Sequence, residues 1–197
     1  MSKKLGGIEI IKKAFALDPV ERIPWVPFVG VHGAFLTEVD AKTYLQSANE
    51  IVKGVSKSIE EYNPDGIPVV FDLQVEAEVL GCQLKWSETG PPAVVSHPLA
   101  EGKNLSDLKI PESSDGRIAT CLEATKVLRQ KFPETALYGL ITGPFTLALH
   151  LAGTDIFMQL YEAPEKVHEI MKFCTHVSSQ MAEYYMDAGC DVIAVVD

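Results

Sequence analysis

The sequence is poor in positive charge, has no long apolar run and contains no closely paired cysteines. Its 197 residues include 17 Lys and Arg against 27 Asp and Glu, which gives a formal net charge of −10. Binding to nucleic acid or to an anionic membrane surface requires clustered Lys and Arg, so this balance argues against both partners. No apolar stretch reaches the roughly 18 residues of a membrane helix, and the start MSKKLGGIEI lacks the apolar core of a signal peptide. We therefore expect a cytoplasmic protein.

The four cysteines are scattered along the chain without a CxxC pair; they are Cys82, Cys121, Cys174 and Cys190. Scattered cysteines fit reduced thiols, and this arrangement lacks the local spacing of a zinc site. We expect no metal site formed by this chain alone.

The first third of the chain alternates between helical and strand patterns. Apolar positions at helical spacing predict a helix over residues 7–17, and RIPWVPFVGV predicts a first strand that ends near His32 and is made irregular by its two prolines. Asp40 is a suitable cap for a long amphipathic helix that runs to Tyr62. The turn NPDG then leads into a second strand, IPVVF, over residues 67–71.

The remaining patterns continue this alternation. They predict a short helix over residues 73–80, a β-hairpin over 82–99, a polar loop over 101–114 and a helix over 115–132. A strand over 136–143 and a short helix over 144–153 follow. Two helices separated around Ala163-Pro164 occupy residues 155–189, and a last buried strand occupies 190–197. Strands that alternate with helices imply a parallel sheet, either open or part of a (β/α)8 barrel. The chain is shorter than the roughly 250 residues of a complete barrel. Both architectures place ligands at the carboxyl ends of the strands.

Three carboxylates follow the second strand. Burying an ionised carboxylate is costly unless it is paired or hydrogen-bonded, so Asp72 has either a structural or a functional use. It is a good cap for the helix over residues 73–80, and it also ends a strand at the rim where ligands bind. Glu76, one turn further on, is expected to face the same cleft, whereas Glu78 is expected to be solvated or salt-bridged.

Other candidate residues follow the first and third strands. His32 lies in a glycine-flanked loop, and His150 lies in a largely apolar helix, where a packing role is the alternative. Gly143 and Phe145 open the segment GPFTLALH, whose helix begins at Pro144. The amino end of that helix could hold an anion such as a phosphate or sulfonate, or Gly143 could serve only a tight turn. We expect structural or surface roles for the other histidines, which are His97, His168 and His176.

Several blocks resemble the uroporphyrinogen decarboxylase superfamily over nearly the whole chain. They are ERIPWVPF, VVFDLQVEAEVLG, PPAVVSHPL, LYGLITGPFTLALHLAG and YYMDAGCDVIAVVD. The superfamily contains the decarboxylases of haem biosynthesis and the corrinoid-linked methyltransferases, such as those acting between methylcobalamin and coenzyme M. Both are (β/α)8 barrels. The resemblance implies that residues 1–197 are the first, truncated half of such a barrel, with about four βα units and a β-hairpin insertion after the second strand.

Single positions separate the two branches. The decarboxylases carry an arginine-rich RQAGRY loop after the first strand, because the many carboxylates of their substrate need guanidinium partners. The matching stretch here, VGVHGAFL, has no Arg or Lys, and His150 stands where the decarboxylases have a tyrosine. The resemblance therefore implies a corrinoid-dependent methyltransferase that moves a methyl group between a cobalamin carrier and a small-molecule donor or thiol acceptor. Asp72 and His150 would be catalytic, and the substrate-binding residues would be His32, Glu76, Gly143 and Phe145.

The resemblance also implies cofactors and partners that this chain does not supply. Family methyltransferases use zinc to activate the acceptor thiol. The zinc ligands, a His-x-Cys pair and a later Cys, belong to the second half of the barrel. The full-length protein is thus expected to use zinc and a corrinoid-binding partner protein. A half-barrel has open sheet edges, which favours pairing with a second copy or with a missing half. The alternatives are a uroporphyrinogen decarboxylase and a non-catalytic half-barrel.

Overall fold

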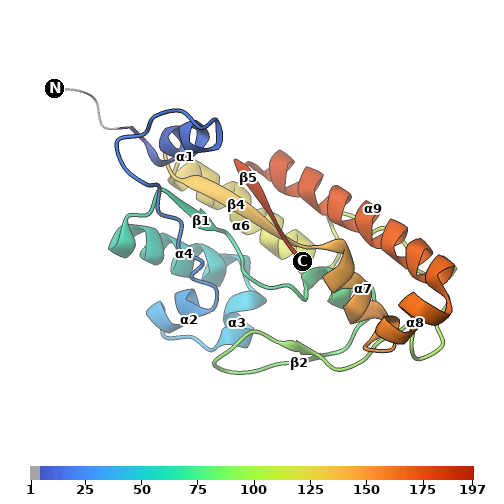
Figure 1. Cartoon of the computed structure of the whole chain (residues 1–197). Coiled ribbons are helices and arrows are strands. Elements are labelled where there is room, and N and C mark those ends of the chain that lie inside the picture. The colour runs from blue at the N-terminus through green and yellow to red at the C-terminus, as the bar shows by residue number, and fades with distance from the viewer. Residues whose placement is uncertain (1–4) are drawn as a thin grey trace.

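A three-stranded parallel sheet forms the centre of the computed structural model, which describes residues 5–197 (Figure 1). The strand order is β1-β4-β5, from β1 (Gly66–Pro68), β4 (Ala136–Thr142) and β5 (Val192–Val196). Gly66 lies opposite Ala136, and Tyr138 lies opposite Val192. Neighbouring parallel strands need long crossover connections, and the helices between the strands supply them.

The helices cover one face and one end of this sheet. In chain order they are α1 (Gly7–Phe15), α2 (His32–Leu36), α3 (Ala41–Leu45), α4 (Ala48–Tyr62), α5 (Val75–Val79), α6 (Gly116–Lys131), α7 (Pro144–Ala152), α8 (Ile156–Glu162) and α9 (Pro164–Ala188), with a 3-10 turn at Leu105–Asp107. Helix α6 packs between α4 and α9 behind the sheet, and α1 packs against β1 and β4. The carboxyl ends of the strands point away from α1, toward α7 and the loops.

The central strand β4 is buried along its whole length. Leu137 and Ile141 belong to the large core shared with the helices, whereas Tyr138 packs with Ile10 and Ile11 of α1. Gly139 allows α9 to approach closely, because a Cβ atom there would lie 2.6 Å from the Cβ atom of Tyr185. This alternation of faces is that of a β-strand covered on both sides.

The prediction of a strand over residues 22–31 is wrong, although that segment runs beside β1. Trp25 accepts a hydrogen bond from the Asp65 amide at 2.9 Å, and further along the segment Gly30 lies against Phe71. The Trp25 amide donates to the Asp65 side chain at 2.8 Å, where a ladder would use a backbone carbonyl. The two prolines of the segment, Pro24 and Pro27, have no N–H to donate to a ladder. The segment takes the place of a strand without being one.

The long helix predicted from Asp40 to Tyr62 is divided in two. Asp40 caps α3, as predicted, by accepting a hydrogen bond from the Thr43 amide at 2.9 Å. A second cap, Ser47, accepts from the Glu50 amide at 3.4 Å and begins α4. Each cap satisfies an amide that the first turn of a helix leaves without an intrahelical partner.

Strand β1 is shorter than the predicted range of 67–71. It ends at Pro68, and the next residue, Val69, makes one further bond to the Tyr138 carbonyl at 3.1 Å before the chain leaves the sheet. A short antiparallel pair follows α5, between β2 (Leu84–Lys85) and β3 (Ala93–Val94). The chain after β3 is anchored on α7, because the Leu99 amide donates to the Leu151 carbonyl at 2.9 Å.

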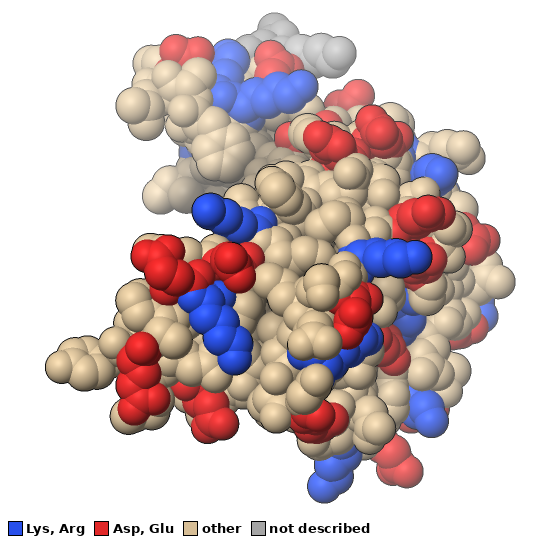
Figure 2. All heavy atoms as spheres, turned by 90° about the vertical axis from the view of Figure 1, so that its right-hand side faces the viewer, with Lys and Arg blue, Asp and Glu red and all other residues tan. Residues whose placement is uncertain are grey.

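The predicted break around Ala163-Pro164 separates α8 from α9, and Gly189 ends α9 in a left-handed conformation with φ of 109°. Both outcomes agree with the sequence pattern. On the face shown in Figure 2, Lys and Arg side chains are scattered among acidic ones and do not gather into a patch. Within residues 5–197, every helix is too short or too polar to cross a membrane.

Candidate functional site

A cavity of about 360 Å³ lies where the chain leaves β1. Its walls come from two parallel stretches, Phe28–Val31 and Phe71–Gln74, with Pro91 from the loop between β2 and β3. The Phe28 and Phe71 rings meet edge to face with their centroids 5.6 Å apart. A hollow of this size suits a small molecule. A larger hollow of about 550 Å³ lies beside α1 and Glu134, at the amino end of the sheet, where such folds do not place their sites.

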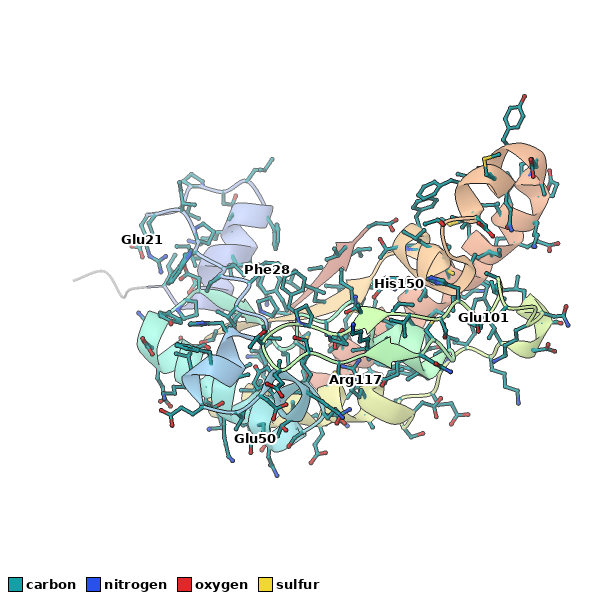
Figure 3. All side chains as sticks on the ribbon, turned by 90° about the horizontal axis from the view of Figure 1, so that it is seen from below. Glu21, Phe28, Glu50, Glu101, Arg117 and His150 are labelled. Carbon is teal, nitrogen blue, oxygen red and sulfur yellow. The ribbon has the colours of Figure 1, made fainter. Side chains whose placement is uncertain are left out.

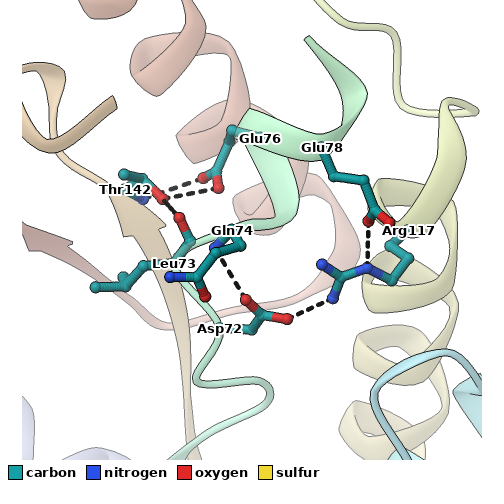
Figure 4. Close-up of polar contacts among 7 residues, drawn as sticks. All are labelled: Asp72, Leu73, Gln74, Glu76, Glu78, Arg117 and Thr142. Atoms are coloured by element: carbon teal, nitrogen blue, oxygen red, sulfur yellow. Dashed lines mark hydrogen bonds and ion pairs between the residues drawn. The ribbon is translucent and has the colours of Figure 1, made fainter. Parts of the chain in front are cut away.

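Asp72 ends the stretch after β1 and is held inside the protein (Figure 4). Its Oδ1 accepts a hydrogen bond from the Gln74 amide at 2.9 Å, and its Oδ2 accepts one from Arg117 Nη1 at 2.5 Å. The Asp72 side chain is 0% exposed, so Asp72 meets the cavity through its backbone. The contact with Gln74 is a local turn and not the predicted helix cap, because α5 begins at Val75 and its N-cap, Gln74, has no side-chain cap hydrogen bond. The contact with Arg117 offsets the cost of burying the charge.

Arg117 joins two of the three carboxylates that follow β1. Besides Asp72, Arg117 contacts Glu78: its Nε donates to Glu78 Oε2 at 2.5 Å. The Arg117 guanidinium also lies 4.9 Å from the centroid of the Trp86 ring. Glu78 is therefore salt-bridged, as the sequence predicts. The Arg117 side chain is 7% exposed, and its Nη2 is buried without a hydrogen-bond partner within the described residues. One guanidinium thus ties α6 to both ends of the segment 72–78.

Sequence reasoning missed Arg117, although a signal was present. The residue lies in the first turn of α6, immediately after the helix begins at Gly116. A cation there is unfavourable, because the amino end of a helix carries partial positive charge. An arginine in that position indicates a specific anionic partner, and the partner here is Asp72.

Glu76 lies on α5 with 1% of its surface exposed and points toward the end of β4. Its Oε1 accepts a hydrogen bond from the Thr142 amide at 3.0 Å, and its Oε2 lies 2.8 Å from Thr142 Oγ1. Burial raises the pKa of the Glu76 carboxyl, and the charge of Asp72 adds to that shift. Thr142 is a second residue that the sequence analysis did not select.

His32 begins α2 and contacts α4. Its Nε2 lies 2.7 Å from the hydroxyl of Tyr62, and its ring stacks on Phe35 and Tyr62 with centroid distances of 5.7 and 5.9 Å. The residues before it, up to Val31, line the cavity, but His32 does not. The structure therefore places His32 next to the cavity, with its imidazole bonded to the scaffold.

His150 lies on α7 and is half-buried, with Nδ1 buried and unpartnered within the described residues. Burial lowers its pKa, the neighbouring His97 lowers it further, and Asp72 opposes both. The His150 carbonyl accepts from His97 Nδ1 at 2.8 Å and lies 3.4 Å from the Cys82 sulfur. Figure 3, seen from below, shows Phe28, Arg117 and His150 reaching this end of the molecule from three separate segments.

Gly143 and Phe145 lie at the start of α7, and neither is among the residues that line the cavity. The position proposed for an anion is taken by a side chain: Asp197 Oδ1 accepts from the Thr146 amide at 2.8 Å. Gly143 packs directly on Asp197, and the Phe145 ring lies 6.0 Å from that of Phe157 on α8. The structure thus places Gly143 against Asp197 and Phe145 against Phe157.

Comparison with known proteins identifies the family. The model of the uroporphyrinogen decarboxylase (URO-D) family matches residues 8–197, almost the whole chain. The chain belongs to the uroporphyrinogen decarboxylase family. This confirms the resemblance found in the sequence.

Relatives within the uroporphyrinogen decarboxylase family include proteins of both branches. The methylcobamide:CoM methyltransferase MtbA of Methanosarcina mazei is 29% identical over 96% of this chain, which corresponds to 57% of the relative. The uroporphyrinogen decarboxylase of Aliarcobacter butzleri is 28% identical over 68% of this chain and 40% of the relative. The similarity to the methyltransferase therefore extends over more of the chain, as the sequence blocks indicate.

A solved structure described as a methyltransferase from Methanosarcina mazei shares the fold, with a TM-score of 0.88 at 24% sequence identity. It matches 98% of this chain and 59% of its own length. The chain is thus an α/β protein that matches part of a barrel. It spans 57% of the length of MtbA and 59% of the length of this solved chain.

The described residues do not form a metal site. Within residues 5–197, no three His, Cys, Asp or Glu side chains lie close enough together to hold an ion. The four cysteines are free thiols, and burial raises the pKa of each to about 12. The described residues therefore do not bring together the set of ligands that a zinc ion of the kind implied by the family resemblance needs.

Proposed function

We propose that the chain forms the N-terminal half of a corrinoid-dependent methyltransferase and binds a small-molecule methyl donor or a thiol acceptor at the cavity after β1. The relatives support the branch, since the named methyltransferases match nearly the whole chain. The corrinoid, carried by a partner protein, would supply the cobalt-bound methyl group. We further propose that a second copy or a remaining half covers the open edges of the sheet, and that the protein is cytoplasmic.

The observation that carries the proposal is the character of the cavity. Its lining residues include two phenylalanines, three other apolar side chains, one glycine and one proline, and no Lys or Arg; they are Phe28, Val29, Gly30, Val31, Phe71, Asp72, Leu73, Gln74 and Pro91. The cation behind the wall, Arg117, is bonded to Asp72 and Glu78. A substrate with many carboxylates needs several guanidinium partners, which these walls do not offer. A small, largely apolar group fits them.

The residues of this chain would bind and orient the ligand. The apolar walls exclude water, and the buried pair between Asp72 and Arg117 keeps the backbone of residues 72–74 in place. His150 has a lowered pKa and is therefore neutral at neutral pH, with a ring nitrogen able to accept a hydrogen bond. His150 is not among the residues that line the cavity, so we propose that it accepts one from a part of the ligand that extends beyond these walls.

Ligand binding tests the proposal more directly than turnover, because the chain spans only part of its relatives. Coenzyme M and uroporphyrinogen III are the two probes, and binding is measured by calorimetry. Replacing Gln74 by Trp fills the cavity and keeps the backbone amide that bonds Asp72. Gln130 is an exposed residue of α6, and Gln130→Trp makes the same chemical change away from the cavity.

We expect the protein and its Gln130→Trp variant to bind coenzyme M, and Gln74→Trp to lose that binding while it unfolds at the same temperature. Methyl transfer from methylcobalamin to coenzyme M is then measured with the full reading frame. A chain that binds uroporphyrinogen III contradicts the proposal, and one that binds neither probe contradicts a site for a thiol acceptor in this cavity.

A further inference from the structure

The hydroxyl group of Thr142 lies between the carboxyl group of Glu76 and a backbone carbonyl oxygen. Thr142 Oγ1 lies 2.8 Å from Glu76 Oε2 and 2.9 Å from the Leu73 carbonyl oxygen (Figure 4). A hydroxyl group has one hydrogen to donate, and a carbonyl oxygen can only accept. If Glu76 were ionised, two acceptors would share one hydrogen, and one close oxygen–oxygen contact would have no proton.

A proton on Glu76 removes this conflict. Glu76 then donates to Thr142 Oγ1, and Thr142 donates to the Leu73 carbonyl, while Glu76 Oε1 still accepts from the Thr142 amide at 3.0 Å. Each oxygen–oxygen contact contains a proton. Glu76 and Thr142 are 1% and 0% exposed, so solvent water is not available to provide a missing donor, and a buried group without one is costly.

The hydrogen bonds from Thr142 favour the ionised form of Glu76, whereas burial and the nearby titratable groups oppose it and the net shift of its pKa is upward. The groups that interact with it electrostatically are Asp72 from the stretch after β1 and Tyr185 from α9, with Cys121 of α6 affected in turn. Asp72 carries a like charge, which disfavours a second one nearby. The cation of α6, Arg117, bonds Asp72 and Glu78. Burial raises the pKa of the Glu76 carboxyl, in agreement with the hydrogen-bond geometry.

We infer that Glu76 is a neutral carboxylic acid at neutral pH and acts as a positioning residue for the proposed ligand cavity. Its proton begins a chain of hydrogen bonds that passes through Thr142, at the end of β4, to Leu73, which lines the cavity. The chain fixes the wall residues that follow β1 to the neighbouring strand. Glu76 itself does not touch the ligand. The inference about the ligand rests on the proposed function, whereas the protonation state does not.

Infrared spectroscopy tests the protonation state without any ligand. The spectrum of the protein minus that of Glu76→Gln, recorded at neutral pH, should contain the carbonyl band of a protonated carboxylic acid, and this band should shift in heavy water. Glu76→Gln is a suitable reference because its amide can still donate to Thr142 and accept from it. A difference spectrum that contains only carboxylate bands would overturn the inference.

Thr142 variants test the positioning role. Thr142→Val keeps the shape and removes the hydroxyl group, whereas Thr142→Ser restores it. We expect Thr142→Val to speed amide hydrogen exchange across residues 72–76 and to weaken coenzyme M binding by roughly tenfold, the equivalent of about one hydrogen bond. Thr142→Ser should return both toward normal. Unchanged exchange in Thr142→Val overturns the positioning role even if coenzyme M does not bind at all.

Discussion

Arg117 Nη1 donates to Asp72 Oδ2 at 2.5 Å, and this pair joins the first turn of α6 to the stretch that leaves β1. The Asp72 side chain is 0% exposed and that of Arg117 is 7% exposed. Both charges are therefore removed from water, and each depends on the other. Trp86 covers the guanidinium on one side.

Replacing Arg117 by Met should lower the free energy of unfolding by about 3–5 kcal/mol, because the variant leaves a buried carboxylate without its partner. Urea denaturation measures this loss. In the double variant Arg117→Met, Asp72→Asn no charge is left unpaired, so part of the loss should be recovered.

Glu78→Gln is the matched comparison for this pair. Glu78 also bonds Arg117, but its side chain is 31% exposed, and solvent screening reduces the contribution of such a pair to about 1 kcal/mol or less. If Arg117→Met and Glu78→Gln proved equally destabilising, the importance assigned to the buried Asp72 contact would be refuted.

The stability of the protein should fall as pH rises, through the titration of Glu76. The unfolded carboxyl titrates near its ordinary pKa of 4.5, and burial raises the folded pKa above that. Between the two values the folded state binds more protons, so the contribution is complete below pH 4.5 and is lost as pH rises through the folded pKa. Glu76→Gln should therefore gain stability relative to the wild type across this range. Parallel curves for the two proteins, measured by urea denaturation at several pH values, would show that Glu76 does not titrate in this way.

The titration of His150 should make the protein less stable as pH falls, the opposite of the effect of Glu76. Burial lowers its folded pKa below the ordinary value of 6.5. Between those values the unfolded state binds more protons, so stability decreases as pH falls below 6.5. Thermal unfolding of His150→Gln should show a weaker dependence on pH in this interval. His168, whose side chain is 67% exposed, provides the control variant His168→Gln, which should follow the wild type.

Gly143→Ala should destabilise the carboxyl end of the sheet. A Cβ atom at residue 143 would lie 2.5 Å from the Cβ atom of Asp197, so β5 or α7 must move. We expect a loss of about 1–3 kcal/mol, the usual cost of overpacking. Gly90 is the comparison site, since the nearest atom to its added Cβ would be Ser87 Oγ at 3.7 Å. A Gly90→Ala variant as unstable as Gly143→Ala would mean that the close contact is not the cause.

The cysteine thiols should react slowly in the folded protein. Burial raises the pKa of each to about 12, and the thiolate is the reactive form. Titration with a thiol reagent should label few groups in native buffer and four in denaturant. Rapid labelling of Cys82 in the native protein would indicate that its surroundings open readily.

The elements predicted well are those whose signals are local. The stretch ALYGLIT is a continuous apolar run, as expected for a strand covered on both faces, and Pro144 and Gly189 begin and end helices where the rules place them. The segment 22–31 was misjudged because its two prolines cannot donate to a ladder and the Trp25 amide donates to the Asp65 side chain. That contact joins residues 40 positions apart, which a propensity pattern does not contain.

In the site, too, the local features were predicted from the sequence and the contacts between distant residues were not. The sequence placed Asp72 at the end of a strand because apolar residues run up to it. Its partner Arg117 is 45 positions away, and only the unusual place of an arginine in the first turn of a helix pointed to it. The hydrogen bonds of Glu76 to Thr142 join residues 66 positions apart. Whether Asp72, His150, His32, Glu76, Gly143 and Phe145 have the functional roles assigned from the resemblance remains a prediction for the binding measurements.

Residues 28–31 form one wall of the cavity, and the described segment that contains them has no continuous hydrogen-bonded ladder to β1. A wall of this kind can shift or change sequence with little loss of sheet hydrogen bonds, whereas the opposite wall is fixed by Arg117 and Thr142. Related proteins could therefore accept ligands of different size by varying these four positions while the sheet stays the same. In this fold, substrate preference can therefore diverge through changes in this wall that leave the sheet intact.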